Sequence, residues 1–405
     1  MPIAHHEAEL HWEPNPDALG GRGSRPGFTY RAYVPAPIAD TDPQVPSSLV
    51  HSLVETAAAC RELDRRTERR SPNLETLARQ LLRAESVASS RIEGLIVSHR
   101  RLANADFVGP GADFAAQSVL QNIKGMEYAL RLAVETPELT KESFAAIHRA
   151  MFEGTRDEAH AGVVRDRQNW IGGDASTPLN ADFVPPPEGE VEGLLGDLAA
   201  FANRTDVDAV LQAAIVHAQF ETIHPFWDGN GRVGRVLIHV ILRRRGIVDR
   251  FLPPVSLVLA ANSDAYVRGL TNYRYGDESD WYELCSDALY SAARESIAFG
   301  DRVAELQEHW REQAGNPRRN SAAANLINAL PSHPVVNLRR AVRITGASEP
   351  AVLRAFERLE QAGVLRQTSV GRRNRAFECV GLFALMDDFE RRLGPAGRTP
   401  AATQY

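Results

Sequence analysis

The twelve residues from His224 to Arg235, HPFWDGNGRVGR, constrain this chain more than any other segment. Gly229, Asn230 and Gly231 favour a tight loop, because glycine lets the backbone turn sharply and approach a ligand closely. Apolar residues then recur at helical spacing, so the loop is expected to open into a helix. The free N–H groups and the positive dipole end of such a helix attract an anion. The segment therefore predicts a phosphate-binding loop.

The polar residues of this segment suit proton transfer beside a phosphate. His224 precedes a proline, which disfavours helix at the residue before it, so the apolar helical segment 209–222 is expected to end there. A histidine at that position can take a proton from a hydroxyl at neutral pH, since its ordinary pKa is about 6.5. Asp228 is the single carboxylate of the loop and can hold Mg²⁺ together with substrate oxygens and water. Further donors to phosphate oxygens are Asn230, Arg232 and Arg235.

A purely structural interpretation of the segment is the alternative. Phe226 and Trp227 are interpreted as packing residues that fix the loop. An isolated His or Asp in such a place is more often structural than functional, and a glycine loop can open a helix without any ligand. Packing alone does not require the ordered combination of His, Asp, Gly-Asn-Gly and two Arg, so the functional interpretation is favoured.

The segment resembles the Fic family motif HPFx(D/E)GNGRxxR at every specified position. The resemblance implies a mainly α fold, with a Fic-type helical core and a β-hairpin flap, and an enzyme that transfers AMP from ATP to a hydroxyl of a target protein or of itself. It implies that His224 is the general base and Asp228 the Mg²⁺ ligand. The presence of both Gly231 and Arg232 favours AMP transfer over phosphate transfer. The implied phosphate contacts are an anion hole of Gly229, Asn230 and Gly231, with Arg232 at the α- and β-phosphates and Arg235 at the γ-phosphate.

A second segment, SSRIEG, resembles the Fic inhibitory motif (S/T)xxxE(G/N) through Ser89, Glu93 and Gly94. The resemblance implies that Glu93 pairs with Arg235. A carboxylate in that place would repel the γ-phosphate and engage an arginine that otherwise holds it. The alternative is that Glu93 only decorates the end of a helix.

Weaker patterns suggest a flap and a base contact. Residues 169–187, NWIGGDASTPLNADFVPPP, hold turn-forming residues between two short apolar pieces, 170–171 and 183–184, that could pair as a hairpin. By resemblance this passage is a flap that clamps the target by strand pairing, with a plain surface loop as the alternative. Tyr266 resembles a family tyrosine near the adenine and is equally well interpreted as a core aromatic. The flap residues are Gly172, Gly173, Phe183 and Val184, and the expected packing residues are His217, Phe220 and Ile223.

The chain of 405 residues is long enough for about two or three domains. Residues 1–45 are rich in Gly and Pro and are predicted to be extended. Helices are predicted from Pro46 to Leu63, and from Ser71-Pro72 to a stop near Gly94. The expected divisions are an N-terminal Fic-associated region with the inhibitory helix (1–104), a Fic catalytic core (105–314), a winged helix-turn-helix domain (315–395) and a tail (396–405).

The expected winged helix rests on three short helical patterns followed by two strands around a glycine-basic turn. Ser348 would cap its recognition-type helix, 349–362. Residues 318–375 contain 11 Arg and 3 Glu, an excess of 8 positive charges that can bind nucleic acid.

Composition limits the compartment and the partners. The net charge of −6 argues against polyanion binding by bulk charge. Three distant cysteines indicate a reducing compartment without a disulfide framework or a zinc site. No apolar run reaches 18 residues and the N-terminus is polar, so neither a membrane span nor a secretory signal is expected. Lysine occurs only at Lys124 and Lys141, a bias typical of a GC-rich bacterial genome. We therefore expect a cytoplasmic bacterial protein without membrane contact. The cysteines are Cys60, Cys285 and Cys379.

Three functions remain open on the sequence. The first is an autoinhibited protein adenylyltransferase that uses ATP and Mg²⁺. The second is a DNA-binding regulator that works through the winged helix, although such domains also contact proteins. The third is a Fic enzyme that removes AMP or uses another nucleotide, with Glu93 positioning a hydrolytic water. The target protein, its modified hydroxyl and a homodimeric state are left open.

Overall fold

The computed structural model describes residues 5–13, 27–70, 74–109, 113–174, 176–276, 278–368 and 375–394. The chain divides into two compact units, and each unit gathers several segments of sequence. The predicted linear boundaries at 104 and 314 do not coincide with these units and stay predictions. Unit 1 comprises Met1–Val54, Lys124–Ile247 and Asp264–Ser286, and unit 2 comprises Glu55–Ile123, Val248–Ser263 and Asp287–Tyr405.

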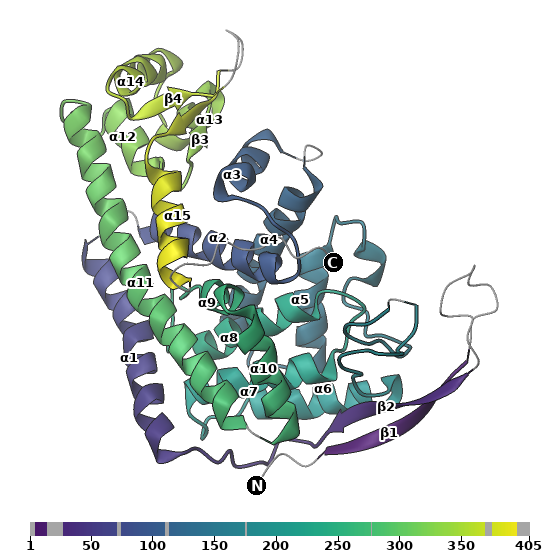
Figure 1. Ribbon diagram of the computed structural model, residues 1–405. Coiled ribbons are helices and arrows are strands. Elements are labelled where there is room, and N and C mark those ends of the chain that lie inside the picture. Colours follow the sequence, from purple (N-terminus) through teal and green to yellow (C-terminus); the bar gives the residue numbers. More distant parts are fainter. Residues whose placement is uncertain are drawn as a thin grey trace. The chain divides into compact units, whose positions relative to one another are not determined.

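Unit 1 is built around two helices, α7 (Ala209–Ile223) and α8 (Asn230–Arg244), which pack against each other (Figure 1). Every residue of α7 is buried, as expected for a helix that is apolar on nearly all sides. The carboxylate of Asp208 caps α7 by accepting the N–H groups of Val210 and Leu211. The other helices of the unit are α5 (Lys141–Phe152), α6 (Glu188–Ala202), α10 (Ser263–Tyr275) and the 3-10 helix Glu158–His160. The first residue of α10, Ser263, belongs to unit 2. Three further helices contribute to both units: α1 (Ser47–Arg70), α4 (Phe114–Glu135) and α11 (Glu278–Gln313).

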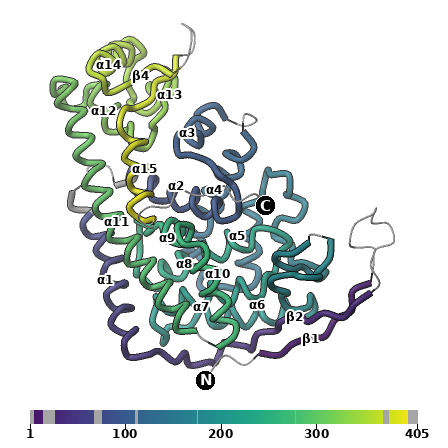
Figure 2. Tube along the Cα trace, viewed as in Figure 1, coloured from purple at the N-terminus to yellow at the C-terminus, as the bar shows by residue number. Residues whose placement is uncertain are grey.

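The N-terminal segment forms an antiparallel hairpin of β1 (His5–Trp12) and β2 (Phe28–Pro35). The register runs from His5 opposite Pro35 to Trp12 opposite Phe28. Figure 2 traces this hairpin in purple and the helices α5 to α8 in teal. The described part of residues 1–45 is therefore extended, as predicted, and it is also paired. After β2 the chain is tied to α6, where Asp197 accepts the N–H groups of Ile38 and Ala39 at 2.6 and 3.0 Å.

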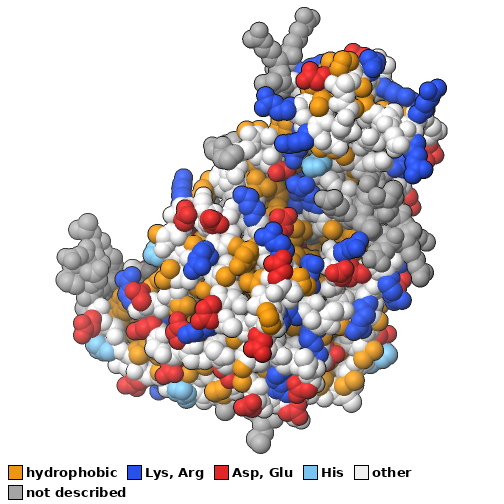
Figure 3. All heavy atoms as spheres, turned by 180° about the vertical axis from the view of Figure 1, so that it is seen from behind, with side chains coloured by type: hydrophobic (Ala, Val, Ile, Leu, Met, Phe, Trp, Pro, Cys, Tyr) orange, Lys and Arg blue, Asp and Glu red, His pale blue; other side chains and the backbone are white. Residues whose placement is uncertain are grey.

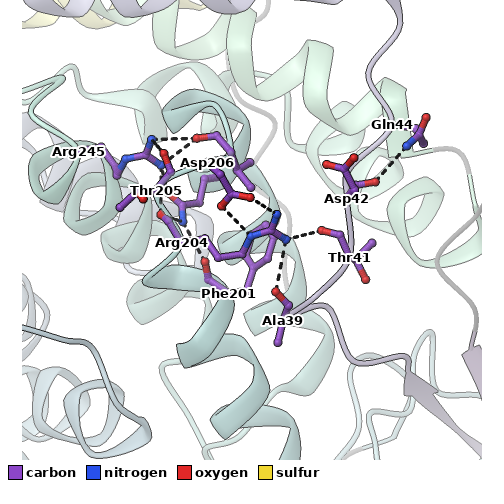
Figure 4. A network of polar contacts seen from close by, with 11 residues as sticks. Ala39, Thr41, Asp42, Gln44, Phe201, Arg204, Thr205, Asp206 and Arg245 are labelled. Atoms are coloured by element: carbon purple, nitrogen blue, oxygen red, sulfur yellow. Dashed lines mark hydrogen bonds and ion pairs between the residues drawn. The ribbon is translucent and has the colours of Figure 1, made fainter.

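Arg245 joins the end of α8 to the loop that precedes α7. Its guanidinium donates to Gln212 Oε1 of α7 at 2.6 Å. It also donates to three loop carbonyls, those of Arg204 at 3.4 Å, Thr205 at 3.0 Å and Val207 at 2.9 Å (Figure 4). Arginine presents five N–H donors in one rigid plane, so a single side chain can satisfy several acceptors.

Arg204 extends this network to the N-terminal segment. It donates to the carbonyl oxygens of Ala39 at 3.3 Å and Thr41 at 2.5 Å, and it pairs with the Asp206 carboxylate at 2.7 Å (Figure 4). The hydrogen bond from Arg204 holds the pKa of Asp206 at about 2, below its ordinary value of 3.8.

We expect Arg245→Ala to lower the free energy of unfolding by about 1–3 kcal/mol, because buried acceptors would lose their donor. Urea unfolding followed by circular dichroism measures this change. The control is Arg250→Ala, which removes an exposed side chain whose pairing with Asp249 is long, at 3.7 Å. The control should shift the unfolding free energy by under about 0.5 kcal/mol, and equal losses in the two variants would contradict the structural role of Arg245.

Unit 2 has an apolar core that joins α2 (Leu74–Ile92) to the C-terminal elements. Buried members of this core include Leu81, Trp310, Phe356 and Phe389. The further helices of the unit are α3 (His99–Val108), α9 (Val255–Ala261), α12 (Ala322–Ala329), α13 (Leu338–Thr345), α14 (Glu349–Gln361) and α15 (Leu382–Leu393).

The C-terminal segment contains a small antiparallel sheet in the order β3-β5-β4. The helices and the two strands after α14 follow the predicted order, and the assignment as a winged helix stays a prediction. Strand β3 was not predicted, because two residues are too short to show a period. Ser348 is the N-cap residue of α14, as predicted, but its side chain makes no capping hydrogen bond. The turn at 369–374 lies outside the described residues. The strands are β3 (Val335–Val336), β4 (Leu365–Gln367) and β5 (Phe377–Cys379).

The predicted first helix begins at Ser47 and continues beyond Leu63 to Arg70. The expected helix start at Ser71-Pro72 lies outside the described residues. In the described part of the chain, none of the helices combines the length and the apolar character needed to cross a membrane.

Candidate active site

The loop between α7 and α8 begins at His224, where the backbone turns into the left-handed region with φ 49° and ψ 58°. This conformation is uncommon for a residue other than glycine. The N–H of His224 still donates to Phe220 O at 2.9 Å and closes the last turn of α7. The half-buried imidazole therefore stands at the end of a helix, as the proline at position 225 predicted.

Arg165 holds this turn from a distant part of the sequence. Its Nε donates to His224 O at 3.0 Å, and its own N–H donates to Pro225 O at 2.9 Å. The same guanidinium also binds the carbonyl oxygens of Arg167 and Pro186. Burial lowers the pKa of Arg165 to about 10, so the group stays charged at neutral pH. Sequence reasoning missed Arg165, because nothing in its local sequence links it to the loop.

Asn230 closes the loop on itself. Its Nδ2 donates to Phe226 O at 2.8 Å, and its Oδ1 accepts the N–H of Phe226 at 2.8 Å. Asn169 adds a donor to the same carbonyl at 3.0 Å. The amide of Asn230 thus holds the loop, and its predicted side-chain contact with phosphate stays a prediction. Its backbone N–H in the first turn of α8 is the group that suits an anion.

Gly229 makes the sharp turn into α8. It has a φ of 77°, and a Cβ at this position would lie 2.5 Å from Phe152 Cε2. Val233 N–H donates to Gly229 O at 3.0 Å and makes the first helical hydrogen bond. The N–H groups of the first turn, including that of Gly231, have no acceptor within an α-helix. The expected glycine turn that opens into a helix N-terminus is therefore present.

His148 of α5 supports the loop through the carbonyl of Asp228. Its Nδ1 accepts the N–H of Gly162 at 2.8 Å, so the neutral ring carries its proton on Nε2 and donates to Asp228 O at 3.0 Å. The ring stacks on Phe226 with centroids 3.9 Å apart. Burial, with the charge of Arg232, lowers the pKa of His148 to about 4. Sequence reasoning missed this residue, although a histidine among the apolar positions of α5 was a usable signal.

Arg232 and Asp228 form an ion pair at 3.3 Å across one helical turn. The guanidinium of Arg232 also lies over the ring of Phe152, 4.6 Å from its centroid. The carboxylate of Asp228 is 64% exposed and accepts the N–H of Gly229 at 2.6 Å. Among the described residues, no group of three or more His, Cys, Asp or Glu could hold a metal ion by itself.

Arg235 is buried at 1% exposure and donates from Nη1 to the hydroxyl of Tyr266 at 3.5 Å. The Tyr266 hydroxyl lies 2.9 Å from His217 Nε2. Burial and the charge of Arg235 lower the pKa of His217 to about 3, so its ring is neutral and can accept from the phenol. Gly234 allows this close packing, since a Cβ there would lie 2.9 Å from His217 Nδ1. Tyr266, at 4% exposure, is a buried aromatic beside Arg235, and its predicted contact with adenine stays a prediction.

Residues 138–242 match the Fic/DOC family, and residues 50–131 match the N-terminal region of the same family. The chain belongs to the Fic/DOC family. Both matched regions contain the segments singled out from the sequence, the first with the motif loop and the second with Ser89–Gly94.

Relatives with established names include protein adenylyltransferases from animals and from a bacterium. Protein adenylyltransferase fic-1 of Caenorhabditis elegans is 28% identical over 173 residues, which are 41% of this chain and 31% of that protein. A probable protein adenylyltransferase of Aquifex aeolicus is 36% identical over 99 residues, 24% of this chain and 28% of that protein. Protein adenylyltransferase Fic of Drosophila grimshawi is 26% identical over 234 residues, 52% of this chain and 45% of that protein. The chain thus spans less than half the length of these curated relatives.

A solved structure shares the fold. The crystal structure of a Fic family protein from Desulfovibrio desulfuricans aligns with a TM-score of 0.51 and 22% sequence identity, over 84% of this chain and 99% of that chain. The architecture is therefore the mainly α Fic fold, as the sequence predicted.

The passage before the Fic motif forms the predicted pairing, but in a shorter form. Ile171 and Phe183 make an antiparallel bridge, with Ile171 N–H donating to Phe183 O at 2.8 Å. Only isolated bridges form among the described residues 169–174 and 176–187, and not two strands. Gly172 and Gly173 both have positive φ, and a Cβ on Gly172 would lie 1.9 Å from a carboxylate oxygen of Asp182. The two glycines are therefore required by the turn.

The N-terminal hairpin supports this passage, a link that the sequence did not reveal. Tyr33 of β2 donates its N–H to Val184 O at 2.9 Å. Trp12 of β1 packs edge-on against Trp170 with centroids 5.6 Å apart. The flap role of these residues stays a prediction.

The predicted inhibitory segment lies at the end of α2 in unit 2. The helix ends at Ile92, just before Gly94, which has a φ of 80°. Two bonds close this end, Gly94 N–H to Arg91 O at 3.0 Å and Leu95 N–H to Ser90 O at 2.9 Å. This confirms the predicted helix stop. Glu93 occupies the C-cap position of α2, and its pairing with Arg235 of unit 1 stays a prediction.

Acid is expected to destabilise the motif loop through His148. Its folded-state pKa of about 4 lies below the ordinary 6.5, so the unfolded chain binds the proton first as pH falls. The stability contribution is complete above about pH 6.5 and is lost as the pH approaches 4. We expect about 2 kcal/mol of loss from His148 between pH 7 and pH 5.

Urea unfolding at a series of pH values measures this effect. His148→Asn should be less stable at pH 7 and should lose less stability on acidification than the unaltered protein. The exposed His309 provides the control, and His309→Asn should keep the original pH dependence. An unchanged pH dependence in His148→Asn would contradict the assignment.

Proposed function

We propose that this protein is an adenylyltransferase that transfers AMP from ATP to a hydroxyl of a protein. One observation carries the proposal: directly after His224, the glycine turn at Gly229 opens into a buried helix that carries Arg232 and Arg235. A helix N-terminus and two arginines suit a triphosphate. The names of the relatives support the same activity.

The chemistry follows from the order of these groups. His224 takes the proton of the acceptor hydroxyl, and the freed oxygen attacks the α-phosphorus of ATP. A new phosphorus–oxygen bond forms, the bond to the β-phosphate bridge breaks, and pyrophosphate leaves. Arg232 and Arg235 hold the phosphates in line. The same turn that ends α7 sets the direction of the imidazole.

Asp228 fits a role as Mg²⁺ ligand. A single exposed carboxylate beside a phosphate-binding loop can bind Mg²⁺ only when substrate oxygens and water complete the shell. When bound, the ion would neutralise negative charge on the phosphates. Asp228 also pairs with Arg232, so the carboxylate orients a phosphate-binding arginine in either case.

Glu93→Gly is expected to raise the incorporation of AMP from labelled ATP by up to about 100-fold. The reason is that displacing the α-phosphate by about 1 Å from its reactive position can lower the rate by about that factor. Autoradiography of the purified chain measures it, and +AMP peptides found by mass spectrometry after incubation with cell lysate identify the target and hydroxyl. Adding His224→Ala to Glu93→Gly should abolish labelling without changing the circular dichroism spectrum. Equal labelling of Glu93→Gly and the unaltered protein would contradict the inhibitory role of Glu93. Labelling in the variant that lacks His224 would contradict its role as the general base. Loss of AMP from a modified target would instead favour the reverse reaction.

Contacts of α15 support the proposed brake. Glu390 pairs with Arg91, inside the inhibitory segment, at 2.9 Å and with His99 at 2.8 Å. Burial alone would raise the pKa of Glu390, but the hydrogen bond and charge of His99, together with Arg91, hold it at about 2. The carboxylate is therefore ionised at neutral pH and fixes the last turn of α2.

Glu390→Gln should raise labelling with ATP, but less than Glu93→Gly does, because it loosens the segment without removing the inhibitory carboxylate. Asp388→Asn is the matched control on the same helix, since Asp388 pairs with Arg302, Arg391 and Arg392 and not with α2. Labelling of Glu390→Gln at the level of Asp388→Asn would show that α15 does not act on the brake.

The arginine excess of the C-terminal segment gives weaker support to DNA binding than its composition suggested. Asp106 pairs with Arg340, and Glu378 pairs with Arg366. The carbonyl oxygen of Ala314 accepts a hydrogen bond from Arg358. Basic and acidic side chains are interspersed on the face shown in Figure 3. A steep loss of duplex binding with rising salt in a gel-shift assay would restore this second function.

A further inference from the structure

Three arginines and a histidine of unit 2 gather around one carboxylate. Asp106 Oδ2 of α3 accepts from Arg83 of α2 at 2.8 Å and from Arg340 of α13 at 3.0 Å. Arg340 also donates to His333 Nδ1 at 3.3 Å. Arg79 precedes Arg83 by four residues on α2 and so stands on the same face of that helix, and its positive charge acts on Arg83, Asp106 and His333. We call these five residues the arginine cluster.

The arginine cluster carries more positive than negative charge. Three guanidinium groups and one carboxylate leave a net charge of +2, from three minus one. Arg83 is 5% exposed and the side chain of Arg340 is 13% exposed. Uncompensated charge in such a place destabilises a fold unless a partner neutralises it.

Hydrogen bonding in the arginine cluster is also incomplete. Nε of Arg340 is buried and has no acceptor among the described residues. His333 accepts at Nδ1, so its neutral ring presents an N–H at Nε2. Burial, and then the charges of Arg79, Arg340 and Arg83, lower the pKa of His333 to about 4, which keeps that ring neutral. Donors are therefore in excess as well as charge.

We propose that the arginine cluster is a binding site for the phosphate group of a small molecule. Guanidinium groups bind phosphate oxygens in pairs, and a phosphate dianion would balance the net charge of +2. Asp106 holds Arg83 and Arg340 in place. The site lies on α2, α3 and α13, outside the Fic motif, so it is separate from the proposed ATP site and does not depend on it.

Isothermal titration of the full chain with inorganic phosphate tests the proposal. The unaltered protein should bind phosphate saturably, and Arg340→Gln should weaken the affinity about tenfold or more, as expected for a lost charge-assisted bond. Arg343→Gln is the matched control, because Arg343 is an exposed arginine one turn along the same helix. Phosphate can also enter the Fic motif loop, so Arg232→Ala is a second control that should leave this binding unchanged.

Three results would overturn the proposal. The first is that the unaltered chain does not bind phosphate saturably, and the second is that Arg340→Gln binds phosphate as tightly as the unaltered chain does. The third is that Arg232→Ala loses all phosphate binding. Should Arg340→Gln fail to fold, Arg79→Gln leaves the bonds of Asp106 intact and should weaken phosphate binding in the same way. A parallel titration with duplex DNA tests whether the phosphate belongs to a small molecule or to a nucleic-acid backbone. Tight DNA binding that depends on Arg340, without binding of inorganic phosphate, would assign the cluster to a nucleic-acid backbone instead.

Discussion

Hydrogen bonds to the backbone of the short loop between α7 and α8 are the constraint on which the rest of the site depends. The loop must leave a buried helix, turn sharply and enter a second buried helix, and so its polar groups cannot rely on water. Arg165 satisfies the carbonyl at the start of the loop, Asn230 satisfies both backbone groups of Phe226, and His148 satisfies the carbonyl of Asp228. With these groups paired, the N-terminus of α8 can face an anion.

The site also depends on histidines that remain neutral. His148 and His217 are buried beside Arg232 and Arg235, and burial together with these arginines lowers the pKa of each ring. A neutral imidazole can accept one hydrogen bond and donate another without competing with a phosphate for the arginines. The positive charge of the loop is thus concentrated on the two motif arginines, where a triphosphate requires it.

Helix α2 has two different sets of neighbours along its length. Arg83 faces Asp106 and Arg340, whereas Arg91 near the C-terminal end is paired with Glu390 of α15. Both sets connect the helix to elements that follow the Fic core in sequence. The proposed phosphate site and the contacts that hold the end of α2 are therefore properties of unit 2 as a folded body, and neither follows from the segment Ser89–Gly94 alone.

Local sequence was sufficient for several features that a few consecutive residues specify. The conformational preferences of glycine and apolar periodicity act over a few residues. They account for the Fic motif, the glycine turn into α8, the end of α2 just before Gly94 and the bridge between Ile171 and Phe183. The order of the C-terminal helices and of the last two strands was available for the same reason.

Long-range folding was needed for the groups that support the site. His148 and Arg165 reach the loop from 59 to 80 residues away in sequence, and the contacts of Asp106 and Arg340 span 234 residues. The side chain of Asn230 matched the family motif, but only the tertiary structure shows that it bonds to both backbone groups of Phe226 and so holds the loop. Side-chain chemistry alone does not choose a partner, because the choice depends on which donors and acceptors burial brings within hydrogen-bonding distance.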